Sequence, residues 1–225
     1  MTLRILSLFL LSTVLWSCDD VLYTETSDEG QPYYIKVDDY TLDSPVHLVR
    51  DIPTLADDNH VNVVVEIPTG TLEKWEVNKD SGDLNWEIKN GVPRVVEYVG
   101  YPGNYGFIPR TLLPNDAGGD GDPLDVIVLG PPVARGTVLK VSIIGMIRMQ
   151  DRGENDDKLI GVTSGTPFDK VQTLEELDQK FAGVTDILST WFAHYKGEDK
   201  VDVMGVESRE VALEVLARAK QAYAK

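Results

Sequence analysis

Hydrophobic residues after position 60 fall mostly into short runs that are typical of β-strands. Residues 61–67 are rich in β-branched side chains and stop at Pro68. In residues 74–77 polar and apolar side chains alternate, which places Lys74 and Glu76 on one face of a strand. Short strands at close spacing favour a barrel or a sandwich. The predicted strands cover residues 61–67, 74–77, 84–88, 92–99, 126–129, 138–149 and 159–162.

Three later segments have helical spacing. Thr173 and Glu176 form a capping-box pattern before an apolar stripe that ends at Phe181. A second stripe runs from Val184 to Tyr195, and a third follows a candidate cap at Ser208. Strands followed by helices indicate an α+β fold.

The first 18 residues predict a targeting segment. Arg4 precedes an apolar run that is too short to span a bilayer comfortably, which favours a signal peptide. The run ends in Leu15-Trp16-Ser17-Cys18, which looks like a bacterial lipoprotein cleavage box, although Trp16 is bulky for it. Cys18 is the only cysteine, and lipidation would explain it. The alternative is an ordinary signal peptide with an incidental thiol.

These features predict three regions. Residues 1–18 form the signal peptide, residues 19–31 an acidic tether and residues 32–225 one folded domain. With Cys18 as a lipid anchor, the domain would lie outside the cytoplasm, in the periplasm or at the cell surface. It would be cytoplasmic if the leader is not processed.

The charge balance limits the partners. Among 225 residues, 37 acidic against 21 basic side chains give a net charge of −16. Such a chain lacks the broad basic face that nucleic-acid binding needs. It would also repel an anionic substrate unless cations and a local basic cluster reversed the field.

The acidic segment Asp120-Gly121-Asp122-Pro123-Leu124-Asp125 is the clearest chemical signal. Two unit charges about 4 Å apart interact by about 4 kcal/mol at an effective dielectric of about 20, so the cluster needs protons or hard cations. By itself the segment fits a solvated turn as well as a divalent-metal site. It does not fit an EF-hand, which requires a glutamate at its twelfth position.

Other segments could complete such a site. Residues 151–158 form a second acidic turn, so Asp120, Asp125, Asp151 and Asp156 could surround shared cations, with Lys158 near a phosphoryl oxygen. Each segment also has a simpler interpretation. Residues 151–158 could be a solvated hairpin, and the tyrosines of residues 101–109 could be ordinary core packing. Residues 195–196 could be a helix end whose lysine reaches out to solvent. The three histidines have no ligand spacing, and no P-loop motif occurs.

The order of these motifs resembles the family I soluble inorganic pyrophosphatases over roughly residues 48–222. The blocks that carry the resemblance are Val65-Glu66-Ile67-Pro68, Lys74-Trp75-Glu76-Val77, Tyr101-x-x-Asn104-Tyr105-Gly106, the acidic segment 120–125, Asp151-x-Gly153-Glu154-x-Asp156-x-Lys158 and Trp191-Phe192-x-x-Tyr195-Lys196. The resemblance implies a five-stranded, OB-like closed β-barrel flanked by helices. It also implies hydrolysis of pyrophosphate to two phosphates with Mg²⁺, for which Mn²⁺ or Zn²⁺ could substitute, and a homo-oligomer of undecided size.

The resemblance assigns roles position by position. Asp122 would accept the proton of the attacking water. The other assigned residues are the metal ligands Asp120, Asp125, Asp151 and Asp156, the water-mediated metal contacts Glu66 and Glu76, the phosphate-binding residues Lys74, Arg94, Lys158, Tyr195 and Lys196, and the site-lining Tyr101 and Tyr105.

Two departures keep alternatives open. Arg152 stands where many bacterial members have a second acid, and most relatives lack a leader. A non-catalytic surface lipoprotein that binds phosphate or cations is one alternative. An enzyme acting on organic polyphosphates is another.

Overall fold

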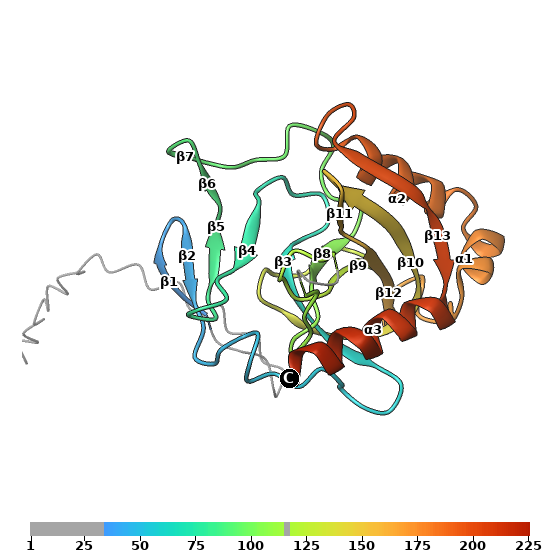
Figure 1. The fold of residues 1–225 in the computed structure, drawn as a ribbon, viewed down its shortest axis with the longest axis horizontal. Helices are drawn as coiled ribbons and strands as arrows, with labels where there is room; N and C mark the ends of the chain where they lie inside the picture. Colours follow the sequence, from blue (N-terminus) through green and yellow to red (C-terminus); the bar gives the residue numbers. More distant parts are fainter. Residues whose placement is uncertain (1–33, 115–117) are drawn as a thin grey trace, which may run out of the picture.

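The computed structural model describes residues 34–114 and 118–225, so the predicted leader, Cys18 and tether lie outside the described residues. The chain forms β-strands first and helices mainly at the end (Figure 1). The strands are β1 (Ile35–Asp38), β2 (Thr41–Asp43), β3 (Val61–Ile67), β4 (Trp75–Val77), β5 (Leu84–Trp86), β6 (Ile88–Lys89), β7 (Val92–Pro93), β8 (Asn104–Phe107), β9 (Asp125–Leu129), β10 (Val138–Asp151), β11 (Glu154–Asn155), β12 (Lys158–Thr163) and β13 (Val201–Ser208). The helices are α1 (Leu174–Lys180), α2 (Val184–His194) and α3 (Arg209–Tyr223).

Five strands of the main sheet pair in a continuous circuit. Antiparallel pairs join β3 to β8, β8 to β9, β12 to β10 and β10 back to β3, and the parallel pair β9–β12 completes the circuit. The length of β10 makes this possible, because its first residues pair with β3 and its later residues with β12 and β13. The strand bends through register shifts between Ile143 and Gly145 and between Arg148 and Met149.

The helices cover this sheet from outside. In Figure 1, α1 and α2 lie beyond β13, and α3 runs along the lower edge of the sheet. Leu177, Leu188 and Phe192 pack with sheet residues in one core cluster, and Ala212 and Leu216 of α3 pack in a second. A third cluster lies under the small sheet of β1, β2, β5 and β4. Removing such apolar area from water stabilises the fold by about 25 cal/mol per Å².

Most predicted elements are confirmed, with two clear errors. The strand predicted over residues 92–99 is reduced to β7, which pairs with β6, and to a single bridge between Val95 and Glu73. Pro93 has no N–H to donate, and Val95 and Val99 are exposed. Sequence reasoning also missed β1, β2, β8, β11 and β13, of which β8 and β13 carry glycines within the strand.

Gly106 shows why β8 contains a glycine. A Cβ built on this residue would lie 1.9 Å from the carbonyl oxygen of Val64 on β3. The close approach of β8 to β3 therefore requires a residue without a side chain. In the part of the chain that the structure describes, no helix is long and apolar enough to cross a membrane.

Candidate active site

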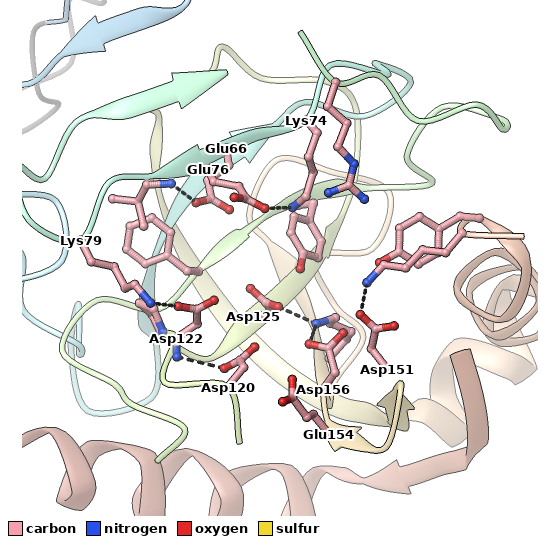
Figure 2. A pocket seen from close by; sticks show the side chains of 18 residues that line it. Glu66, Lys74, Glu76, Lys79, Asp120, Asp122, Asp125, Asp151, Glu154 and Asp156 are labelled. Carbon is pink, nitrogen blue, oxygen red and sulfur yellow. Dashed lines mark hydrogen bonds and ion pairs between the residues drawn. The ribbon is translucent and has the colours of Figure 1, made fainter. Parts of the chain in front are cut away.

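A cavity of about 310 Å³ opens at one end of the main sheet, and its lining is dominated by charged side chains (Figure 2). Almost every predicted site residue takes part in it. The lining residues are Glu66, Lys74, Glu76, Val77, Lys79, Arg94, Tyr105, Phe107, Asp120, Asp122, Pro123, Asp125, Asp151, Glu154, Asp156, Lys158, Tyr195 and Lys196.

The parallel pair β9–β12 brings the two acidic turns together. Val126 pairs with Leu159, so Asp125 and Lys158 begin neighbouring strands at the same edge. The turn that holds Asp120 and Asp122 precedes β9, and the turn after Asp151 leads through β11 to β12. Segments 26 or more residues apart in sequence thus face one cavity, with their carboxylates directed inward in Figure 2.

Lys158 holds two of these carboxylates. Its ammonium lies 2.5 Å from Asp125 Oδ2 and also donates to Asp156 Oδ1. Burial by itself would lower the pKa of Lys158, but the charges of Asp125 and Asp156 raise it above its usual value. Burial raises the pKa of the Asp156 carboxyl, and Lys158 opposes that rise. The ammonium therefore occupies a position between carboxylates that a bound cation could share.

Glu66, Lys74 and Glu76 form the opposite wall. Lys74 Nζ lies 3.0 Å from Glu76 Oε1, as expected for residues on the same face of a strand. The backbone N–H of Val77 donates to Glu66 Oε1 at 2.7 Å. Glu66 is 4% exposed, and burial raises its carboxyl pKa to about 8 although Lys74 acts to lower it. Additional positive charge near Glu66 would favour its ionised form.

The turn before β9 fixes Asp120 and Asp122. The N–H of Asp122 donates to Asp120 Oδ1 at 2.9 Å, and Gly121 has a φ of +80°, which a residue without Cβ adopts without strain. Burial raises the pKa of the Asp120 carboxyl. Lys79, which sequence reasoning missed, forms an ion pair with Asp122, in which its ammonium donates to Asp122 Oδ1. Its only sequence signal was its position five residues after Lys74.

The carboxylate oxygens that line the cavity are the type of ligand that divalent cations prefer. Within residues 34–114 and 118–225, no three His, Cys, Asp or Glu side chains converge closely enough to hold a metal ion. Lysines instead neutralise the carboxylates, including Lys196, whose Nζ lies 2.7 Å from Asp151 Oδ2. The other oxygen, Asp151 Oδ1, is buried without a hydrogen-bond partner. A buried carboxylate oxygen without a partner, in a residue of a cavity lined by several other carboxylates, suits Mg²⁺, which prefers oxygen ligands.

Three aromatic residues stand where the lining meets the core. Tyr105 lines the cavity, and the ammonium of Lys74 lies 5.2 Å from the centre of its ring. Tyr101 lies behind it, 5.2 Å from Tyr105 and 6.5 Å from Tyr195 between ring centres, and is not part of the lining. Burial raises the pKa of both Tyr101 and Tyr105 above the usual value. These phenols therefore stay protonated at neutral pH.

Arg94 lines the cavity, but its guanidinium is paired. Nη1 lies 2.5 Å from Glu87 Oε2, a partner that sequence reasoning missed. Burial opposes the charged guanidinium, and Glu87 outweighs that effect to raise the pKa of Arg94. Glu154 lines the cavity too, although only its place in the second acidic turn had signalled it.

Comparison with known proteins agrees with this arrangement. The family model described as "Inorganic pyrophosphatase" matches residues 63–224. A protein of Xylella fastidiosa named inorganic pyrophosphatase is 33% identical over 168 residues, which cover 72% of this chain and 89% of that protein. The crystal structure of inorganic pyrophosphatase from Thermus thermophilus matches with a TM-score of 0.67 and 30% identity, over 80% of this chain and 100% of that one.

A more distant structure shows the fold alone. The N-terminally truncated vacuolar soluble pyrophosphatase of Trypanosoma cruzi, solved in complex with PPi, matches with a TM-score of 0.76. It is 24% identical, and the match covers 97% of each chain. The likeness to solved structures therefore extends beyond the strand circuit to nearly the whole of the T. cruzi chain.

Proposed function

Because this chain belongs to the inorganic pyrophosphatase family, we propose that it hydrolyses pyrophosphate to two phosphates with the help of divalent cations, Mg²⁺ above all. The observation that carries the proposal is the convergence of the two acidic turns and four lysines on one cavity. The strand circuit supports a five-stranded, OB-like closed barrel flanked by helices, and such a barrel would hold both turns at one end.

The carboxylates have two roles in this proposal. Asp120, Asp125, Asp151 and Asp156 would hold the cations directly, and Glu66 and Glu76 would contact them through water. Bound divalent cations supply two things: they lower the pKa of coordinated water, and they offset charge on phosphoryl oxygens. Asp122, in the turn before β9, would accept a proton from the attacking water.

The basic residues and phenols hold the substrate. Lys74, Lys158 and Lys196 would donate to phosphoryl oxygens, with Arg94 and the phenol of Tyr195 at the same wall. The oxygen of water bonds to one phosphorus while the bond from that phosphorus to the bridging oxygen breaks. Lys158 and Lys196, which pair with carboxylates in the structure, would exchange these partners for the leaving phosphate as the cations take up the carboxylates. Tyr105 would line the substrate position, and Tyr101 would support it from behind.

Phosphate release from pyrophosphate tests this function directly. Purified protein should release phosphate rapidly with Mg²⁺ and stop when the ion is chelated, and Mn²⁺ or Zn²⁺ should restore part of the rate. A protein that binds pyrophosphate tightly in calorimetry without hydrolysing it under any of these ions would instead be the non-catalytic binder.

Location and assembly extend the proposal. A lipidated Cys18, the acidic segment 19–31 and a folded domain over residues 32–225 would place the enzyme outside the cytoplasmic membrane. Homo-oligomer formation is supported by the family resemblance, and light scattering on the purified protein would measure it.

A further inference from the structure

A second cavity, of about 410 Å³, lies beside the active-site cavity; we call it the side cavity. The two share Arg94, Tyr195 and Lys196 in their linings. The remaining polar part of the side-cavity lining comes from Lys89, Asn90, Glu97 and Arg152. The shared residues mean that a ligand could extend from one cavity into the other past these side chains.

A tight turn fixes the backbone of Arg152 at the side cavity. Asp151 pairs with Glu154, so Arg152 and Gly153 form a two-residue hairpin turn, with φ values of +52° and +90°. Such left-handed pairs are typical of tight hairpins. The N–H of Arg152 also donates to the carbonyl of Lys200 at 3.3 Å. Two consecutive residues therefore line the two cavities: Asp151 lines the active-site cavity, and Arg152 lines the side cavity.

The charge of the side cavity is opposite to that of the chain. Four cations line it, Lys89, Arg94, Arg152 and Lys196, against the single carboxylate of Glu97. Arg94 and Lys196 are paired with Glu87 and Asp151. No ion pair involves Lys89 or Arg152 within the described part of the chain. In a chain of net charge −16, two unpaired cations in one hollow favour an anionic ligand.

We propose that the side cavity takes the third phosphoryl group of linear inorganic tripolyphosphate, with Arg152 and Lys89 as specificity-determining residues. The proposal rests on the proposed function, since the other two phosphoryl groups would occupy the pyrophosphate positions. Water would bond to the phosphorus at the active-site end, and the bond from that phosphorus to its bridging oxygen would break. The products are orthophosphate and pyrophosphate, and the proton of water passes to solvent through Asp122.

The test compares two substrates in matched variants. Arg152→Gln removes the charge at similar length, Arg152→Lys keeps the charge, and Lys170→Gln is the control, because Lys170 is exposed and lines neither cavity. Steady-state kinetics with Mg²⁺ would give kcat and KM for tripolyphosphate and for pyrophosphate. Calorimetry on Asp122→Asn protein, with and without Arg152→Gln, would measure binding of both anions separately from turnover.

We expect Arg152→Gln to lower kcat/KM for tripolyphosphate about tenfold, mainly through KM, which corresponds to about 1.4 kcal/mol. Pyrophosphate turnover should stay close to the wild-type value, and Arg152→Lys should keep most of the tripolyphosphate activity. Binding of tripolyphosphate should weaken by a similar factor in the Asp122→Asn background.

Three results would overturn the proposal while leaving pyrophosphate hydrolysis intact. They are no binding or turnover of tripolyphosphate by the wild type, an equal loss for both substrates in Arg152→Gln, and, in a parallel assay with a nucleoside triphosphate, a loss in Arg152→Gln for that substrate alone, which would assign the side cavity to organic polyphosphates. If the wild type hydrolyses neither anion, the proposed function fails together with this inference.

Discussion

At the scale of single residues, the lysines and carboxylates of the site pair with one another and so neutralise each other's charge. Lys158 lies between Asp125 and Asp156, Lys79 pairs with Asp122, and Lys196 pairs with Asp151. A polyanion brings charges that the lysines can bind, and the carboxylates then need other cations. Exchange of partners between lysines and carboxylates therefore links substrate binding to metal binding.

Asp122→Asn tests the proposed base. The amide keeps the size of the side chain but accepts no proton at neutral pH, so turnover of pyrophosphate should fall by about 10²-fold or more. Urea unfolding should show little change, because Asp122 is partly exposed and its own N–H, which is unchanged, makes the bond to Asp120. A near-normal rate would remove Asp122 from this role.

Lys158→Met tests the charge balance of the buried site. Removing one partner of a buried ion pair leaves unpaired charge and typically lowers the free energy of unfolding by about 3–5 kcal/mol. Chemical denaturation of the metal-free protein should show a loss of this order. Excess Mg²⁺ should reduce the loss, because it offsets the charges of Asp125 and Asp156. An equal loss with and without Mg²⁺ would contradict the account.

At the scale of secondary-structure elements, the sequence predicted what periodicity and local capping control. Residues 61–67 and 126–129 could be recognised because they are continuous buried strands, α1 because of its capping box, and α2 and α3 because their apolar stripes are long. β8 could not be recognised, since Gly106 is explained only by its approach to Val64 on another strand. Residues 92–99 have strand composition, but only Val92 and Pro93 form a strand, and beyond them the segment contributes a single bridge between Val95 and Glu73.

The two predicted helix caps differ in the structure, which gives a matched test. Thr173 Oγ1 accepts from the N–H of Glu176 at 3.2 Å, whereas Ser208 makes no capping bond to the backbone and donates to Glu210 Oε2 instead. Thr173→Ala should therefore lower the free energy of unfolding by about 1 kcal/mol, and Ser208→Ala by much less. Thermal or urea unfolding of both variants would measure this. Equal losses would mean that the cap at Thr173 contributes nothing specific.

The site followed the same division between local and distant information. The acidic turns, Lys74, Glu76 and Lys158 could be predicted, because each lies in a motif with its own local pattern. Lys79 and Glu87 could not, since their importance depends on which side chains the strand pairing brings near them. Tyr101 was predicted to line the site, but it packs against the ring of Tyr105, which lines the cavity instead.

At the scale of the whole molecule, a strongly acidic chain concentrates its basic residues around two adjoining cavities. Lys74, Lys158 and Lys196 line the first, and Lys89 and Arg152 the second, while the net charge is −16. This arrangement lets a phosphate anion bind locally although the chain as a whole repels it. Divalent cations would lower that repulsion further.

Attachment to a membrane is a property of the whole chain that one residue should control. If Cys18 carries the lipid, cells expressing the protein should incorporate labelled palmitate into it, and Cys18→Ala should abolish the label and release activity from the membrane fraction. Palmitate incorporation that persists in Cys18→Ala, or a wild-type protein found only in the soluble fraction, would contradict the proposed anchor.

The central claim is that the two acidic turns share the same cations, and Mg²⁺ titration by calorimetry tests it most directly. Asp120→Asn alters the first turn and Asp156→Asn the second, with Asp169→Asn as a control, because Asp169 is exposed and lines none of the described cavities. The account predicts that both site variants weaken the same Mg²⁺-binding step, each by about tenfold or more, while the control leaves it unchanged. Unchanged Mg²⁺ affinity in either site variant would show that the turns do not act together.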